Sequence, residues 1–303
     1  MFLDPDKRVG LAAAAGRVGD GALIALGGGL SARLPMALVR ELIRQGRRHL
    51  HVVGSAHSID VDLLIAAGAL AICEESYVGF EQDLGLAPAY RRAAQERSIV
   101  VRESCCVTML TQLRAAEMGL PFLPVRGIKG TDMRRLHPEY AETTCPFTGE
   151  VLVAVPPLVP DVALLHAPMG DLRGNLHLEQ PYVLDERFAS ASRMVVATVD
   201  RIVSTDTVTE AGITIPAHLV AAVSEVPYGA HPSSCYPGYS YDRDHMSAYV
   251  DAAGSADSAT AYVTEWVLAP GGEDAYRERI GAKRLAELGG WSESTEAWKE
   301  LFV

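Results

Sequence analysis

Short apolar runs alternate with segments of helical periodicity along most of this 303-residue chain. Runs such as 22–26, 70–73 and 162–166 are rich in Leu, Ile, Val and Ala, which is typical of strands buried on both faces. Segments between such runs, for example 60–68 and 88–97, carry residues spaced as on a helix. Helices between strands favour parallel pairing, because parallel strands need a crossover connection. The sequence therefore predicts an α/β fold with a mainly parallel open sheet and helices on both faces.

Composition and charge exclude several function classes. The net charge of −11 argues against a nucleic-acid surface, and no apolar run approaches the ~18 residues of a membrane span. The N-terminus lacks the apolar core of a signal peptide, and the five cysteines form no C-x-x-C pair. We therefore expect a cytoplasmic protein with free thiols that binds neither nucleic acid nor membrane.

The stretch 98–132 is the strongest candidate for a ligand site. Its apolar run 99–101 predicts a buried strand that ends at Glu103, followed by a helix that Gly119 ends. A second apolar run, 122–125, leads into Arg126 and a Gly-x-x-Gly loop. This pattern predicts a strand–helix–strand unit with charged residues at the carboxyl ends of both strands, where ligands bind in open α/β sheets.

The residues of this stretch allow more than one interpretation. Glu103 is either a base or nucleophile in a partly dry cleft, or an acidic residue that favours a helix start. Cys105 and Cys106 are interpreted as small buried side chains rather than nucleophiles. Arg126 suits a phosphate or carboxylate, or an ordinary surface role. The chain shows no ordered His/Cys spacing for zinc, so no metal site is predicted, and His166 is expected to organise a loop.

Three consecutive glycines, at 27–29, separate a predicted strand from a predicted helix. Such a run lets backbone approach a ligand closely and directs a helix N-terminus at an anion, although a tight turn is the simpler alternative. Ser31 is placed to cap the helix. The run matches neither a dinucleotide fingerprint nor a phosphate-binding P-loop.

Several motifs, taken in order, resemble the family I coenzyme A transferases. They resemble the first, or α, subunit of that family, glutaconate CoA-transferase in particular. The motifs lie at 19–35, 64–68, 77–81, 119–124, 160–175 and 226–232. The resemblance covers about 5 to 265. We therefore divide the chain into a CoA-transferase α-subunit-like domain at 1–265 and a C-terminal helical extension at 266–303.

The resemblance implies a heteromeric enzyme that moves CoA from an acyl-CoA to a free acid, without a tightly bound cofactor. The CoA thioester is the substrate. In two-subunit members the nucleophilic glutamate lies in a Ser-Glu-Asn-Gly-like motif of the β subunit, and this chain carries Glu74-Glu75-Ser76-Tyr77 at the corresponding strand end. The resemblance makes Gly28, Gly29, Ser31, Tyr77 and Arg126 candidate substrate-binding residues, with Glu103 in the acyl site.

Three functions stay open at this point. The main hypothesis is the α subunit of a heteromeric CoA-transferase that acts on a small dicarboxylic acid with a β-subunit partner. A second is a two-component hydrolase that opens rings of CoA thioesters, in which a carboxylate at the position of Glu103 acts as base. A third is a scaffold subunit that binds acyl-CoA without turnover.

Overall fold

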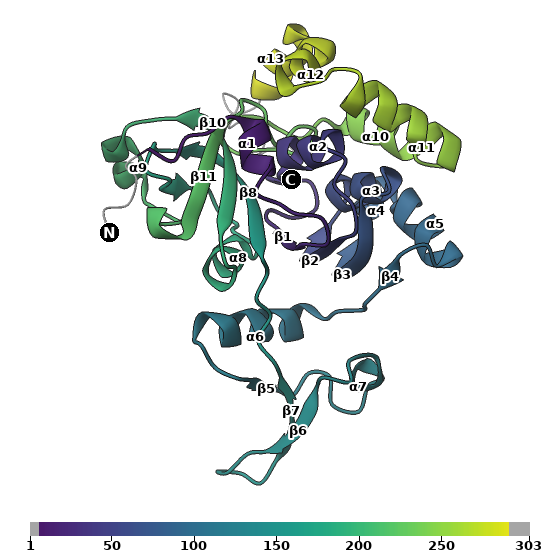
Figure 1. The fold of residues 1–303 in the computed structure, drawn as a ribbon, viewed down its shortest axis with the longest axis vertical. Helices are drawn as coiled ribbons and strands as arrows, with labels where there is room; N and C mark the ends of the chain where they lie inside the picture. Colours follow the sequence, from purple (N-terminus) through teal and green to yellow (C-terminus); the bar gives the residue numbers. More distant parts are fainter. Residues whose placement is uncertain (1–5, 291–303) are drawn as a thin grey trace, which may run out of the picture.

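The computed structural model describes residues 6–290, and an eight-stranded sheet forms its centre (Figure 1). The strand order is β11-β10-β8-β1-β2-β3-β4, and β9 pairs with β8. All strands of that path are parallel to their neighbours, whereas β9 is antiparallel, so the predicted mainly parallel sheet is confirmed. The bounds are β1 (Leu23–Leu26), β2 (Leu50–His57), β3 (Leu70–Val78), β4 (Val100–Val101), β8 (Val162–Gly170), β9 (Leu176–His177), β10 (Val195–Ile202) and β11 (Val220–Glu225).

Helices cover both faces of this sheet, as predicted. One core contains Ile24 and Val52 of the sheet, and the other contains the neighbouring residues Ala25 and Val53. Because alternate side chains of a strand point to opposite faces, both sets are apolar and both faces are buried. The first face packs α1 (Leu11–Ala15), α2 (Met36–Arg44), α3 (Ile59–Ala66), α5 (Pro88–Glu96) and α10 (Arg243–Ala252). The second packs α6 (Cys106–Glu117) and α8 (Asp185–Ala191).

A second, three-stranded antiparallel sheet hangs below the main sheet in Figure 1 and is reached through β4 and α6. We call residues 120–157 the small module. It contains β5 (Leu123–Val125), α7 (Met133–Leu136), β6 (Ala141–Thr144) and β7 (Val151–Val155), in the strand order β5-β7-β6. Its own small core is formed by Val125, Ile128, Tyr140, Val153 and Val155.

The predicted strand–helix–strand unit is wrong. The strand β4 is a two-residue edge strand whose Val100 and Val101 side chains are exposed, and β5 belongs to the small module rather than to the main sheet. Pro124 lacks an N–H group and is confined to edge positions, which fits β5 at the edge of the small sheet. Glu103 and Arg126 therefore do not follow neighbouring strands of one sheet.

The remaining helices lie mostly near the C-terminus, where α12 and α13 cap the top of the molecule (Figure 1). A π-helix at Val263–Leu268 crosses the predicted domain boundary at 265, and this division stays a prediction; 291–303 of the extension lie outside the described residues. No helix in the described part is long and apolar enough to cross a membrane. The bounds are α4 (Glu81–Leu84), α9 (Thr205–Ala211), η1 (Ala217–Leu219), α11 (Ala256–Tyr262), η2 (Val263–Leu268), α12 (Glu273–Ile280) and α13 (Ala282–Gly289).

Candidate functional site

The glycine loop after β1 is closed by contacts within the chain. Gly28 has a φ of +73°, and a side-chain carbon there would lie 2.4 Å from the carbonyl oxygen of Ala32, so only glycine fits. The N–H of Gly28 donates to Asp185 (2.8 Å), and that of Gly29 donates to Ala32 (3.0 Å). The fold therefore already uses both N–H groups, and a thioester contact by these two glycines stays a prediction.

A buried ion pair between Arg33 and Asp185 supports the glycine loop. Arg33 Nη2 lies 3.0 Å from Asp185 Oδ2, and both side chains are almost fully buried. Burial raises the pKa of Asp185, and the Arg33 guanidinium opposes that rise. The two residues are far apart in the sequence, so no local pattern predicts the pair.

A second buried cluster lies at the ends of β2 and β3. His57 Nδ1 lies 3.0 Å from Glu75 Oε1, and Nε2 lies 3.8 Å from Asp60 Oδ2. Burial alone lowers the pKa of His57, but the two carboxylates outweigh it and raise the pKa to about 9. A side-chain carbon on Gly54 would lie 2.2 Å from Glu75 Oε1, so the glycine makes room for the pair. Glu75 is thus held inside the protein rather than offered to a ligand.

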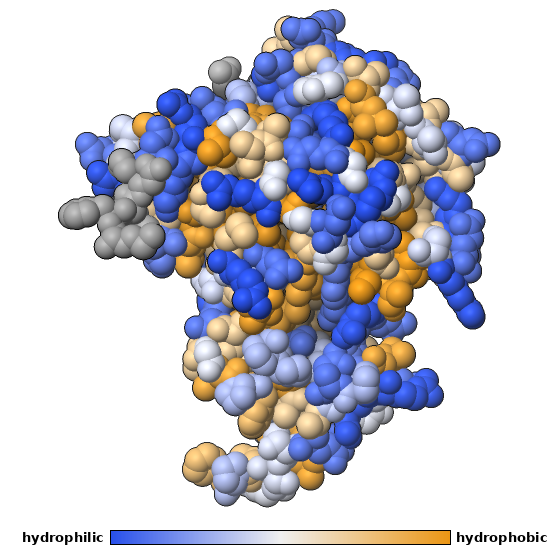
Figure 2. Space-filling model, viewed as in Figure 1, coloured by the Kyte–Doolittle hydropathy of each residue, from blue (hydrophilic) through white to orange (hydrophobic). Residues whose placement is uncertain are grey.

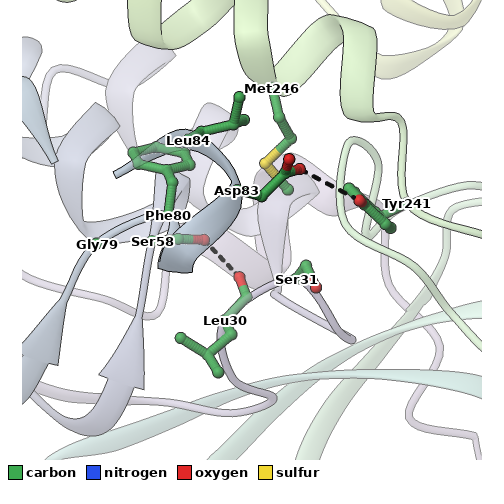
Figure 3. A pocket seen from close by; sticks show the side chains of 9 residues that line it. All are labelled: Leu30, Ser31, Ser58, Gly79, Phe80, Asp83, Leu84, Tyr241 and Met246. Carbon is green, nitrogen blue, oxygen red and sulfur yellow. Dashed lines mark hydrogen bonds between the residues drawn. The ribbon is translucent and has the colours of Figure 1, made fainter. Parts of the chain in front are cut away.

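A small pocket of about 150 Å³ opens at the same edge of the sheet (Figure 3). Ser31 lines it, whereas α2 begins at Met36 with no side-chain cap, so the predicted capping role of Ser31 is wrong. Tyr77 lies beside it: a side-chain carbon on Gly79 would lie 2.5 Å from the Tyr77 hydroxyl. The structure thus brings Ser31 and Tyr77 to one edge. The lining residues are Leu30, Ser31, Ser58, Gly79, Phe80, Asp83, Leu84, Tyr241 and Met246.

A polar network joins β3, β4 and the small module beside Glu103. Arg102 Nε lies 3.0 Å from Glu74 Oε2, and its Nη2 donates to Glu139 (2.6 Å). His137 Nε2 donates to the backbone carbonyl of Glu103 (2.6 Å), and His137 Nδ1 lies 3.0 Å from Glu139. Although burial raises the pKa of Glu139, its hydrogen bond with His137 holds the pKa below the ordinary value. This network fixes the backbone that carries Glu103.

The carboxylate of Glu103 itself is exposed, and within residues 6–290 it has no hydrogen bond or ion pair. Arg126 differs, because it pairs with Glu150 (2.7 Å), also at the surface. The Arg126 loop borders the start of α6, since a side-chain carbon on Gly127 would lie 4.0 Å from Val107. No described contact joins Glu103 to Arg126. The predicted burial of the cysteines is wrong for Cys106, which is exposed and accepts a hydrogen bond from Ser55.

Comparison with known proteins identifies the family. A model of the coenzyme A transferase family matches residues 10–226. The chain belongs to the coenzyme A transferase family. This match confirms the resemblance that the sequence motifs indicated, and it makes the chain an enzyme subunit of CoA-transferase type.

Relatives within the CoA-transferase family carry different activities. A glutaconate CoA-transferase subunit of Acidaminococcus fermentans is 31% identical over 289 residues, covering 89% of this chain and 90% of that protein. The cholesterol ring-cleaving hydrolase IpdA subunit of Rhodococcus jostii is 32% identical over 299 residues, covering 95% and 99%. An uncharacterized protein of Archaeoglobus fulgidus is 32% identical over 273 residues, and the chain spans 61% of its length.

The solved structures that this chain resembles also carry names of different activities. Glutaconate coenzyme A-transferase from Acidaminococcus fermentans superimposes with a TM-score of 0.88 at 29% identity, covering 93% of this chain and 95% of that one. The decarboxylase AibA/AibB gives 0.79 at 32% identity, covering 87% and 99%. A transferase, a hydrolase and a decarboxylase are thus similarly distant in sequence, so sequence similarity alone does not decide which reaction this chain serves.

Proposed function

We propose that this chain is the α subunit of a heteromeric CoA-transferase that moves CoA between an acyl-CoA and a small dicarboxylic acid. The nucleophilic glutamate would belong to a β subunit. One observation carries this proposal: both glutamates at the end of β3 are buried and held. Glu74 pairs with Arg102, and Glu75 pairs with His57. A nucleophile must reach the thioester carbonyl with an accessible carboxylate, and the side chains of Glu74 and Glu75 are both buried.

The proposed reaction needs no metal or ATP. A glutamate carboxylate of the partner attacks the thioester carbonyl, and the C–S bond breaks to give an acyl-glutamyl anhydride and CoA thiolate. The thiolate then attacks the glutamyl carbonyl, releasing the first acid and leaving a glutamyl-CoA thioester. The acceptor acid repeats the sequence in reverse. One thioester replaces another, so the free-energy change is small.

Exposed hydrophobic side chains around the small module support the proposal that a partner subunit docks there. Nearly half of the exposed large hydrophobic side chains among the described residues lie between residues 100 and 151. Figure 2 shows hydrophobic patches around the middle of the molecule, above the small module. Exposed apolar surface of this kind marks an interaction site. Val100 and Val107 flank Glu103 in the sequence, so a partner chain docked there would partly enclose its carboxylate.

A second candidate is hydrolysis of a carbon–carbon bond in a CoA thioester. The observation that favours it is Glu103, whose carboxylate is free while its backbone is fixed by His137. A positioned carboxylate without a partner suits a general base that activates water. The hydrolase relative from Rhodococcus jostii covers nearly the whole chain, which is consistent with this candidate.

The dependence on an acceptor acid tests the proposal. The full chain, purified together with its companion subunit, is supplied with an acyl-CoA, with and without a second carboxylic acid. Transfer predicts that acyl-CoA is consumed only with the acceptor and that the CoA ester of the acceptor appears. Consumption without an acceptor, with a ring-opened or cleaved product, would replace the proposal by hydrolysis. Binding without turnover over a panel of acids would indicate a scaffold subunit.

A further inference from the structure

The geometry points to a zinc-binding site formed by His166, Asp200 and Cys235, a site that the transfer reaction does not use. The three residues come from β8, from β10 and from the loop after β11. A nitrogen, an oxygen and a sulfur of these side chains all lie within 4.8 Å of one another. Nitrogen, carboxylate oxygen and thiolate sulfur are the donors that Zn²⁺ prefers in proteins.

The hydrogen bonds of His166 leave one ring nitrogen directed at Asp200. Nδ1 lies 2.8 Å from the Thr198 hydroxyl, which itself donates to the carbonyl of Leu165. In the tautomer in which the hydroxyl accepts the Nδ1 proton, Nε2 carries a lone pair. The side chain is fully buried, and Nε2 has no hydrogen-bond partner among the described residues. Metal-binding histidines commonly donate their other ring N–H to a neighbouring oxygen in this way.

The spacing of the two acceptors fits a shared cation. His166 Nε2 lies 3.3 Å from Asp200 Oδ1. Without a proton or a cation between them, two lone pairs would face each other in a buried setting. Two ligands of a tetrahedral zinc ion, each bonded at about 2.0–2.2 Å, lie about 3.4 Å apart. A side-chain carbon on Gly229 would lie 2.8 Å from His166 Cε1, so the glycine leaves room for the ring.

The third donor is a free thiol. Cys235 is fully buried and forms no disulfide. Burial raises the pKa of its thiol well above the ordinary value, so a bound cation would have to displace the proton.

One side of the cluster is open. Asp200 also lines a pocket of about 520 Å³, together with Tyr228 and Tyr239. The Tyr239 hydroxyl donates to Asp200 Oδ1 (3.4 Å) and accepts from the N–H of Ala230 (3.0 Å), which orients the carboxylate. The pocket reaches Asp200, whereas His166 and Cys235 do not line it and are fully buried. The site lies at β8, β10 and the loop after β11, away from the β3–β4 end that carries Glu103.

Metal content tests this inference independently of catalysis. The full chain, with its companion subunit, is loaded with Zn²⁺, dialysed and analysed for zinc by mass spectrometry. We expect about one ion per chain in the wild type and in the matched control Cys145→Ser, which removes a free thiol outside the cluster. Loss of an outer partner alone weakens metal binding about 10- to 100-fold, so Asp200→Asn and Cys235→Ser should weaken it by more than about 100-fold.

Cobalt provides a second readout that does not depend on the folding of a variant. Co²⁺ added to the wild type should produce thiolate-to-cobalt charge-transfer absorption, which Zn²⁺ then abolishes. Absence of this absorption, or a wild type without bound zinc after loading, would contradict the proposed zinc site. Equal zinc affinity in Cys235→Ser and wild type would overturn it as well.

Discussion

At the scale of single residues, Glu103 combines a fixed backbone with a free carboxylate. The ring of His137 holds its carbonyl, while the carboxylate has no partner among the described residues. Neighbouring acidic side chains are occupied, since Glu74 and Glu139 both pair with Arg102. Among these three carboxylates, only Glu103 is therefore free to meet a substrate.

Replacing Glu103 by glutamine separates the two candidate reactions. As a general base it should contribute about 10²–10⁴-fold, so Glu103→Gln would lower kcat by that factor in a hydrolase. As a lining residue of a transferase acyl site it should chiefly raise KM for the acid. The control is Glu96→Gln, which changes an exposed glutamate on α5. Unchanged kcat and KM in Glu103→Gln would exclude both roles.

The sequence makes Glu103 a candidate site residue, which stays a prediction, and it does not indicate the residues that hold the Glu103 backbone. An apolar run that ends in a charged residue is a local pattern, and the strand end where it places Glu103 is confirmed. His137 lies in the polar stretch 136–150, and the structure buries its ring. The contact spans 34 residues and depends on how the small module folds back, which no local pattern reports.

At the scale of elements, α12 is held to α2 by a buried ion-pair cluster. Glu273 accepts hydrogen bonds from Arg40 at both carboxylate oxygens (3.0 and 2.5 Å) and from Arg44 (2.9 Å). Burial alone would raise the pKa of Glu273, but the two guanidinium groups hold it below its ordinary value. Helix α12 is thus anchored to the main body.

Breaking that cluster should destabilise the protein strongly. Glu273→Gln leaves the buried Arg40 without its counter-charge and leaves Arg44 with Glu41 alone. Removal of one partner from a buried ion pair costs about 3–5 kcal/mol. Urea unfolding of the full chain measures the loss. The matched control Glu278→Gln changes an exposed glutamate on the same helix and should leave stability unchanged. Equal unfolding midpoints for the two variants would show that the ion pairs between α12 and α2 do not contribute to the stability of the protein.

The elements themselves are predictable where local pattern and burial agree. Helix α5 begins at Pro88, where the predicted helical segment 88–97 begins, and β7 ends before the Pro-Pro pair at 156–157. The prediction fails for β5, whose apolar run resembles a strand of the main sheet. Pro124 argues against a place for this run in the main sheet, because a residue without an N–H group does not fit a central parallel strand. Which sheet a short strand joins is decided by long-range packing.

At the scale of the whole molecule, the buried charges beneath the glycine loop couple stability to pH. His57 is protonated between Glu75 and Asp60, with a pKa of about 9 against an ordinary value of 6.5. The folded state therefore keeps a proton that the unfolded state releases. This contribution is complete below pH 6.5 and is lost as the pH rises through about 9.

The free energy of unfolding should accordingly fall by about 3 kcal/mol between these two pH values. Urea unfolding across this range measures the slope. In His57→Gln the slope should flatten, whereas His218→Gln, a change at an exposed histidine, should keep it. A slope of the same size in His57→Gln would mean that other groups cause the pH dependence.

We propose that this chain shapes the site while a partner supplies the nucleophile. The most direct test is a borohydride trap of the complex purified from its source, after addition of acyl-CoA, followed by peptide mass mapping. We expect one reduced glutamate, on the companion chain. A reduced Glu75 or Glu103 in this chain would contradict it, and consumption of acyl-CoA without any reduced glutamate would favour the hydrolase instead.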